Sequence, residues 1–125
     1  GKRQTGVMIS NGQGPSPAYA QFAMQERGRL FVEPNQEIYE GQIVGIHAKD
    51  NDLTVNALRA KQLTNFRASG KDDALALTPP VKFSLEQALE FIEDDELVEV
   101  TPNAIRLRKK ALTENDRKRA SRQAA

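Results

Sequence analysis

A basic and polar segment, residues 49–71, has the composition of a nucleic-acid contact. Its cations are separated by amides, hydroxyls and one aromatic side chain, Phe66. Cations bind phosphates, amides and hydroxyls reach sugars or base edges, and an aromatic ring stacks on a base. The alternative is an ordinary polar loop whose Phe66 packs back on the core. A structureless loop of this length is usually functional or mobile, which modestly favours a function. The polar side chains concerned are Lys49, Arg59, Lys61, Asn65, Arg67 and Lys71.

The net charge of +1 hides a separation of charge along the chain. Residues 84–100 contain seven acids and no base, whereas residues 105–122 contain eight bases and two acids. Residues 49–71 contain five bases and two acids. Because local fields decide what a surface attracts, such a chain can bind a polyanion on one side. The alternative is that the acidic and basic segments neutralise each other in the fold.

Catalytic chemistry has little support in the sequence. Residues 69–71 (Ser-Gly-Lys) look like the end of a phosphate-binding loop, but Asp72 stands where the magnesium-binding hydroxyl belongs. Asn65 stands where the first glycine of that loop is required. No set of nucleophile, base and oxyanion donors converges elsewhere. We therefore expect no catalytic residue and no enzyme activity in this chain.

The acids Glu93–Glu96 and the single histidine, His47, are the remaining candidates for metal or acid–base chemistry. The acids lack the spacing of a calcium loop, and one histidine without any cysteine excludes the usual zinc sites. The acids fit better as a solvated helix end or as a partner for the basic segments. At the end of an apolar strand, His47 fits better as a hydrogen-bonded structural residue. We expect no metal site.

The length and composition indicate one small domain with a polar surface. The chain has 125 residues and a mass of 13.9 kDa, with 28% charged and 38% hydrophobic residues. No apolar run approaches the roughly 20 residues of a membrane helix. No apolar signal region follows residues 1–4. We expect a monomeric cytoplasmic protein, or a piece of one, that binds no membrane.

The first half of the chain predicts one short amphipathic helix among several strands. The helix is expected from Ala18 to Glu26, with Ser16 as N-cap and Gly28 as the C-terminal cap. Its apolar face is expected to carry Tyr19, Phe22 and Ala23. Strands are predicted at residues 6–9, 30–32, 38–47 and 53–58, the last two paired, before a long loop from 59 to 73.

The second half predicts a capped helix, a hairpin and a basic helix. Ser84 and Gln87 form a capping box. The buried side of that helix is expected to comprise Leu85, Leu89, Phe91 and Ile92. Alternating residues on both sides of a turn at 101–103 predict a hairpin over 96–108. Thr113, with Asp116 three residues later, is expected to begin a final basic helix.

These elements predict an α+β fold that is mainly β. Gly41 and Gly45 lie within the predicted strand 38–47, where they indicate a bulge, a sharp bend or close approach of another backbone. We therefore expect a small, strongly curved, partly closed barrel-like sheet with two or three helices.

Five collinear stretches resemble one family. They are residues 25–28 (QERG), 38–47 (IYEGQIVGIH), 51–56 (NDLTVN), 63–70 (LTNFRASG) and 84–108, the last with the core LEQALEFIEDDELVEVTP. Together they resemble the C-terminal domain of the BipA/TypA translational GTPases, from Gly6 to about Arg122. At residues 15–17 (Pro-Ser-Pro) the chain departs from the family pattern, losing a cation that this segment would otherwise offer to RNA.

The resemblance implies a division of the chain. Residues 1–110 would form the family's C-terminal domain, and 111–125 a basic C-terminal helix or tail. The GTPase and elongation-factor-like domains would lie upstream, so GTP and magnesium would belong to the parent protein and no cofactor to this chain. The parent would act in large-subunit assembly and in stress or low-temperature responses.

The resemblance also implies a partner and a site. The family binds the ribosome, and its C-terminal domain reaches large-subunit rRNA of the 23S type and the tRNA acceptor end near the A site. A mobile RNA-facing loop would span about 52–73. The RNA-binding candidates are Lys49, Arg59, Lys61, Asn65, Arg67 and Lys71, and a second surface comprises Arg106, Arg108, Lys109 and Lys110. The alternative is a protein-docking module whose acids Glu93–Glu96 bind a basic ribosomal protein.

Overall fold

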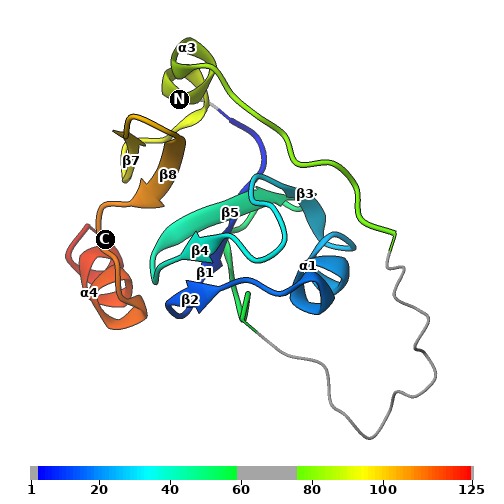
Figure 1. Ribbon diagram of the computed structural model, residues 1–125. Coiled ribbons are helices and arrows are strands. Elements are labelled where there is room, and N and C mark those ends of the chain that lie inside the picture. The colour runs from blue at the N-terminus through cyan, green and yellow to red at the C-terminus, as the bar shows by residue number, and fades with distance from the viewer. Residues whose placement is uncertain (1–2, 59–75, 125) are drawn as a thin grey trace, which may run out of the picture.

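Strand β5 (Gln42–His47) is the centre of the fold (Figure 1). The computed structural model describes residues 3–58 and 76–124. One edge of β5 pairs antiparallel with β1 (Val7–Ser10). Its other edge is shared by β3 (Gly28–Leu30) and β8 (Ile105–Lys109), each antiparallel to it.

Two further strands complete a six-stranded sheet. Strand β6 (Leu53–Val55) pairs parallel with β1, and β7 (Glu96–Val100) pairs antiparallel with β8. A separate two-stranded sheet joins β2 (Gly14–Pro15) to β4 (Glu37–Ile38). The fold is thus α+β and mainly β, as expected.

The sheet is open, so the expected barrel-like closure is not confirmed. Its strand order runs β6-β1-β5-β8-β7, and within the described residues the terminal strands β6 and β7 do not pair with each other. The strand predicted at 53–58 was expected beside the preceding strand and lies instead on the far edge of β1. A register shift between Met8 and Ile9 bends the β1–β5 pair locally without closing the sheet.

Apolar side chains on both faces of β1 and β5 explain the continuous apolar sequence of these strands. Met8 and Val44 belong to one core cluster with Met24, while Ile9 and Ile43 belong to a second cluster. Successive side chains of a strand point to opposite faces, so a strand buried on both faces is apolar throughout. Three phenylalanine rings, Phe31, Phe83 and Phe91, pack together beside the second cluster.

Helix α1 (Ala18–Met24) differs in detail from the expected helix. Its N-cap is Pro17, and Ser16 is buried instead, where its hydroxyl donates to the Ala57 carbonyl oxygen at 2.7 Å. The buried residues are Ala20, Gln21 and Met24 rather than the expected Tyr19, Phe22 and Ala23. The helix turns this face to the first core cluster through Met24.

Gly28 has a different role from the expected one, whereas Gly41 fits the expected bend and close approach of another backbone. Gly28 begins β3 instead of capping α1, and a Cβ there would lie 1.7 Å from the Ile46 carbonyl oxygen, so the close strand pairing requires glycine. Gly41 has φ +92°, a conformation that favours glycine, and interrupts the predicted strand 38–47 between β4 and β5.

Helix α3 (Leu85–Phe91) has the predicted capping box between Ser84 and Gln87. Its buried side was predicted correctly for Phe91 and Ile92, which pack against the second core cluster, and wrongly for the two leucines. Leu85 and Leu89 are 40% and 56% exposed, whereas the small Ala88 enters the second core cluster. Phe91 and Ile92 are half-buried.

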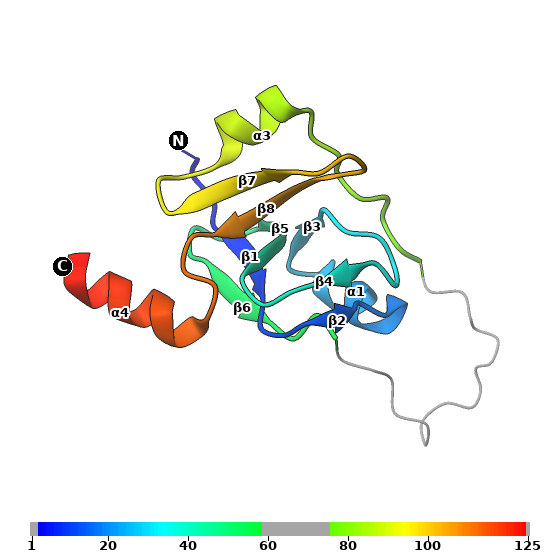
Figure 2. The ribbon, with the colours of Figure 1, turned by 60° about the vertical axis from the view of Figure 1, so that its left-hand side comes forward.

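The predicted hairpin is present as β7 and β8, and the predicted basic helix is α4 (Glu114–Ala124). Figure 2 shows α3 above the hairpin and α4 extending away from the sheet. None of the helices in the described ranges has the length and apolar character of a membrane-spanning segment.

Candidate nucleic-acid interface

Successive side chains of strand β8 point to opposite faces of the sheet, so its basic residues are divided between the two faces. Directly paired residues in an antiparallel ladder share a face, so Arg106 and Arg108 lie with their β7 partners Glu99 and Leu97. Lys109 lies on the other face, where it pairs with Glu96. A run of cations in the sequence therefore contributes to two different environments.

On the first face, two arginines lie with one carboxylate, and within the described residues only one of them forms an ion pair with it. The Nε of Arg108 lies 3.3 Å from Glu99 Oε2, and the Tyr39 hydroxyl donates to the same carboxylate. Burial and this hydrogen bond raise the pKa of Tyr39 above its ordinary value of 10.0. Arg106 is half-buried, and its Nε has no hydrogen-bond partner within the described residues. The two arginines therefore outnumber the one carboxylate on this face. Lys110, the residue after β8, is exposed and lines a groove together with Lys109.

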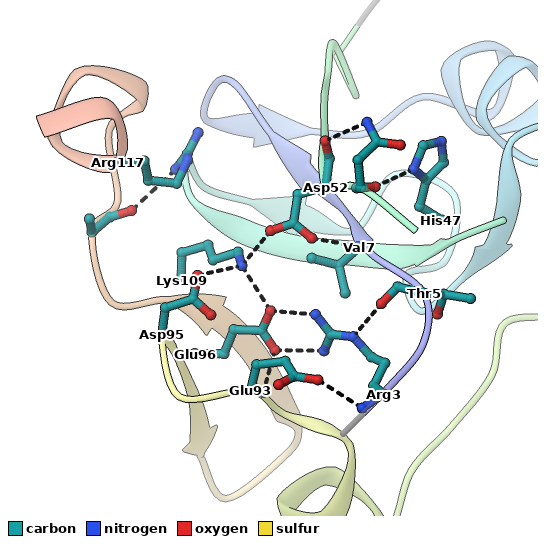
Figure 3. A network of polar contacts seen from close by, with 12 residues as sticks. Arg3, Thr5, Val7, His47, Asp52, Glu93, Asp95, Glu96, Lys109 and Arg117 are labelled. Carbon is teal, nitrogen blue, oxygen red and sulfur yellow. Dashed lines mark hydrogen bonds and ion pairs between the residues drawn. The ribbon is translucent and has the colours of Figure 1, made fainter. Parts of the chain in front are cut away.

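On the second face, Lys109 is enclosed by carboxylates (Figure 3). Its ammonium lies 2.6 Å from Asp52, 2.8 Å from Asp95 and 2.8 Å from Glu96, and its side chain is 3% exposed. These partners come from the start of β6, the turn before β7 and β7 itself. Lys109 was expected on the second RNA surface, and we remove it from that surface because burial and three carboxylates keep its charge from phosphate.

Arg3 completes this buried network. Its two terminal nitrogens each lie 2.7 Å from an oxygen of Glu96, and its guanidinium stacks on the Phe91 ring at 4.6 Å. Burial opposes ionisation of Glu96, but hydrogen bonds from Arg3 and Lys109 lower its pKa to about 2. For both cations burial lowers the pKa, and contact with the carboxylates more than offsets it, so the pKa of each is raised.

This network shows where the acids of residues 93–96 lie. Glu96 is fully buried, and Glu93 accepts a hydrogen bond from the Arg3 backbone N–H at 2.8 Å. The expectation that these acids serve as a partner for the basic segments is therefore confirmed for Asp95 and Glu96. A protein-docking patch formed by Glu93–Glu96 loses Glu96 to the interior, which disfavours that alternative.

Carboxylate oxygens of Asp52, Asp95 and Glu96 lie within 4.8 Å of one another, a spacing that a metal ion could use. The Lys109 ammonium contacts all three carboxylates and supplies the positive charge at their centre. His47 is 4% exposed at the end of β5, with Nδ1 2.6 Å from the Asn51 carbonyl oxygen. This contact agrees with the structural interpretation of the histidine.

Of the first set of RNA candidates, Lys49 is exposed in the turn after β5. The other members lie outside the described residues; they are Arg59, Lys61, Asn65, Arg67 and Lys71. Arg3 and Asp52 were not singled out from the sequence as members of a network. No local pattern could have identified them, because Arg3 and Glu96 are 93 residues apart in the chain.

The fold and this geometry define a small α+β domain with one basic strand face and a buried ion-pair network. Comparison with known proteins assigns it more closely. The sequence model of the TypA/BipA C-terminal domain matches residues 5–114, and the chain belongs to this family.

Similar proteins include relatives from Haemophilus influenzae, Salmonella typhimurium and Escherichia coli K12, which are 68%, 66% and 64% identical over 122 residues. Each of these relatives is named large ribosomal subunit assembly factor BipA. The matches cover 98% of this chain and 20% of each relative, so the chain spans about a fifth of their length.

Proposed function

We propose that this chain is the ribosome-docking C-terminal domain of a translational GTPase that assists assembly of the large ribosomal subunit. Family membership and the names of its relatives support this proposal. The domain contributes binding, and GTP hydrolysis with magnesium belongs to the parent protein. It acts as a monomer in the cytoplasm, and the parent serves stress and low-temperature responses.

The basic face of β8 is the observation that carries the docking proposal. Arg108 pairs with the carboxylate of Glu99, and no ion pair engages the neighbouring Arg106 within the described residues, so the charge of this face is only partly neutralised. Guanidinium and ammonium groups that contact phosphates release condensed counterions, which stabilises the complex without reading the RNA sequence. This face therefore suits the backbone of large-subunit rRNA.

The position on the ribosome is a finer part of the proposal and rests on the family resemblance. The loop at about 52–73 would approach rRNA near the A site and the tRNA acceptor end. Lys49 lies shortly before this loop and is exposed, so it is available as a phosphate contact at the loop's base. The contacts proposed for the rest of the loop involve Arg59, Lys61, Asn65, Arg67 and Lys71.

Co-sedimentation with purified large subunits over a salt series tests the docking proposal. Arg106→Gln with Arg108→Gln should weaken binding and lower the slope of log affinity against log salt by about two. Arg67→Ala with Lys71→Ala should also weaken binding. Neither pair should unfold the domain, which thermal melting would verify.

A matched control removes two charges elsewhere. Arg27 and Arg29 are exposed beside and within β3, and no ion pair engages their side chains among the described residues. Arg27→Gln with Arg29→Gln should bind like the wild-type chain. If the variants at 106 and 108 and at 67 and 71 also bound like wild type, the docking proposal would be wrong.

A further inference from the structure

Helix α4 is held to the domain by several contacts at its N-terminal end. Leu112 packs against Gly41 so closely that a Cβ on this glycine would lie 2.7 Å from its atoms. The Thr113 hydroxyl accepts a hydrogen bond from the Asp116 backbone N–H at 3.0 Å. Arg117 donates through Nη1 to the carbonyl oxygens of Ala111 and Leu112, at 3.2 and 2.7 Å. The helix is thus held where it begins.

Beyond its base, α4 has no apolar face against the domain. Every residue from Glu114 to Arg122 is exposed except the half-buried Arg117. Figure 2 shows the helix extending away from the sheet. Helices of globular proteins are usually held by an apolar stripe, and one that is polar all round commonly bridges to something outside its own domain. Helix α4 is therefore held at its N-terminal end, and the rest of its side chains are available to a partner outside the domain.

The charge of that surface selects its partner. At about 100° per residue, Lys118, Arg119 and Arg122 fall within an arc of roughly 100° on one side of the helix. The acids Glu114 and Asp116 lie in the first turn, and beyond them the described side chains carry only positive charge. The helix dipole favours bases near the C-terminal end, but it does not require that they gather on one side.

The stripe begins close to the end of β8. Lys110 lines a groove of about 870 Å³ with Arg117 and Lys118 of α4 and with the acids Asp52, Asp94 and Asp95, and it borders a second hollow with Arg119. Lys110 therefore adds a cation beside those of α4. Arg119 is held to Asp116 at 3.0 Å, but both side chains are about half exposed or more, so this pair competes only weakly with phosphate.

We propose that α4 is a second RNA-binding element, whose stripe of Lys118, Arg119 and Arg122 binds the phosphate backbone of structured RNA. The proposal rests on the proposed docking function and deepens it. The β8 face gives one part of the contact, and α4 with Lys110 gives a second part that extends outward from the domain. The stripe contains charged groups that bind phosphates and no group that recognises a base. It therefore adds affinity for RNA but no sequence specificity.

The test compares four forms of the 125-residue chain in binding to protein-free large-subunit rRNA and to intact large subunits. They are the wild type, Lys118→Gln with Arg122→Gln, the β8 variant Arg106→Gln with Arg108→Gln, and the control Arg27→Gln with Arg29→Gln. Glutamine has nearly the helix propensity of lysine and arginine, so α4 should keep its helicity by circular dichroism. The α4 variant should bind roughly tenfold more weakly at moderate salt, with a slope lower by about two.

The outcomes separate the two proposals. If the β8 variant binds more weakly than the wild type but the α4 variant binds as tightly as the control, the helix proposal is overturned and the docking proposal stands. If the α4 variant weakens binding to intact subunits but leaves binding to protein-free rRNA unchanged, the helix binds a ribosomal protein and the RNA assignment is overturned. If the wild type binds neither target, both proposals fail.

Discussion

Glu96 carries its negative charge in the interior because two cations reach it from opposite ends of the chain. Arg3 binds both of its oxygens, and Lys109 binds one of them from the neighbouring strand. An ion removed from water is stable only when its geometry and remaining hydrogen bonds compensate for lost hydration. Here a backbone N–H, that of Glu93, also donates to the carboxylate at 2.9 Å.

Replacement of this carboxylate should therefore be costly. Glu96→Gln leaves Arg3 and Lys109 buried beside a neutral amide, and we expect a loss of about 3 kcal/mol in the free energy of unfolding. Asp94→Asn is the matched control. Asp94 is exposed and makes no ion pair among the described residues, so its loss should stay within about 0.5 kcal/mol. Urea denaturation at pH 7 measures both, and equal losses would show that the network stabilises no more than a surface acid.

At the scale of elements, α3 and α4 begin with similar caps but are held in place differently. The Ser84 hydroxyl accepts from the Gln87 N–H at 3.2 Å, and Thr113 accepts from the Asp116 N–H at 3.0 Å. Helix α3 then buries Ala88 in the core, whereas α4 buries no apolar residue among its described side chains. Loss of the N-terminal cap should therefore lower the free energy of unfolding of the whole domain for α3 but not for α4.

Paired substitutions would show this difference. Ser84→Ala should lower the free energy of unfolding by about 1 kcal/mol, because α3 is part of the cooperative core. Thr113→Ala should lower the helical circular dichroism signal and leave the free energy of unfolding within about 0.5 kcal/mol. Urea denaturation followed by near-ultraviolet and far-ultraviolet signals distinguishes the two. A global loss in Thr113→Ala as large as that in Ser84→Ala would mean that α4 unfolds together with the sheet.

At the scale of the whole molecule, the ion network connects segments that lie far apart in the sequence. It links the N-terminal segment through Arg3, the start of β6 through Asp52 and the hairpin through Lys109. Asp52 also accepts from the Val7 N–H of β1 at 3.0 Å. The stability of the domain should consequently depend on the ionisation of the network.

The expected pH dependence follows from the pKa shifts. The pKa of Glu96 falls from 4.5 to about 2 on folding, so its contribution is present above pH 4.5 and is lost as the pH falls toward 2. The pKa of Lys109 is raised above 10.5, so its contribution is present below pH 10.5 and is lost as the pH rises through its folded value. Denaturation between pH 2 and 7 should show an acid decline that is smaller in Glu96→Gln. Identical declines in both proteins would contradict this assignment.

The sequence by itself determined the elements whose information is local. The hairpin over 96–108 follows from alternation on either side of a turn, and the start of α3 follows from the capping box of Ser84 and Gln87. The start and the basic character of the final helix could also be anticipated. The basic face of Arg106 and Arg108 was among the predicted surfaces because a run of cations is visible without a structure.

Only the tertiary structure decided which residues meet. Nothing local shows that β6 pairs parallel with β1, since parallel pairing needs no turn and leaves no short-range pattern. The same holds for the burial of Lys109. Asp95 and Glu96 reach it from the other side of its hairpin, but Asp52 comes from a distant segment. Burial of a charge depends on all of these partners, so only folding divided one basic run between a half-buried strand face and a buried ion-pair network.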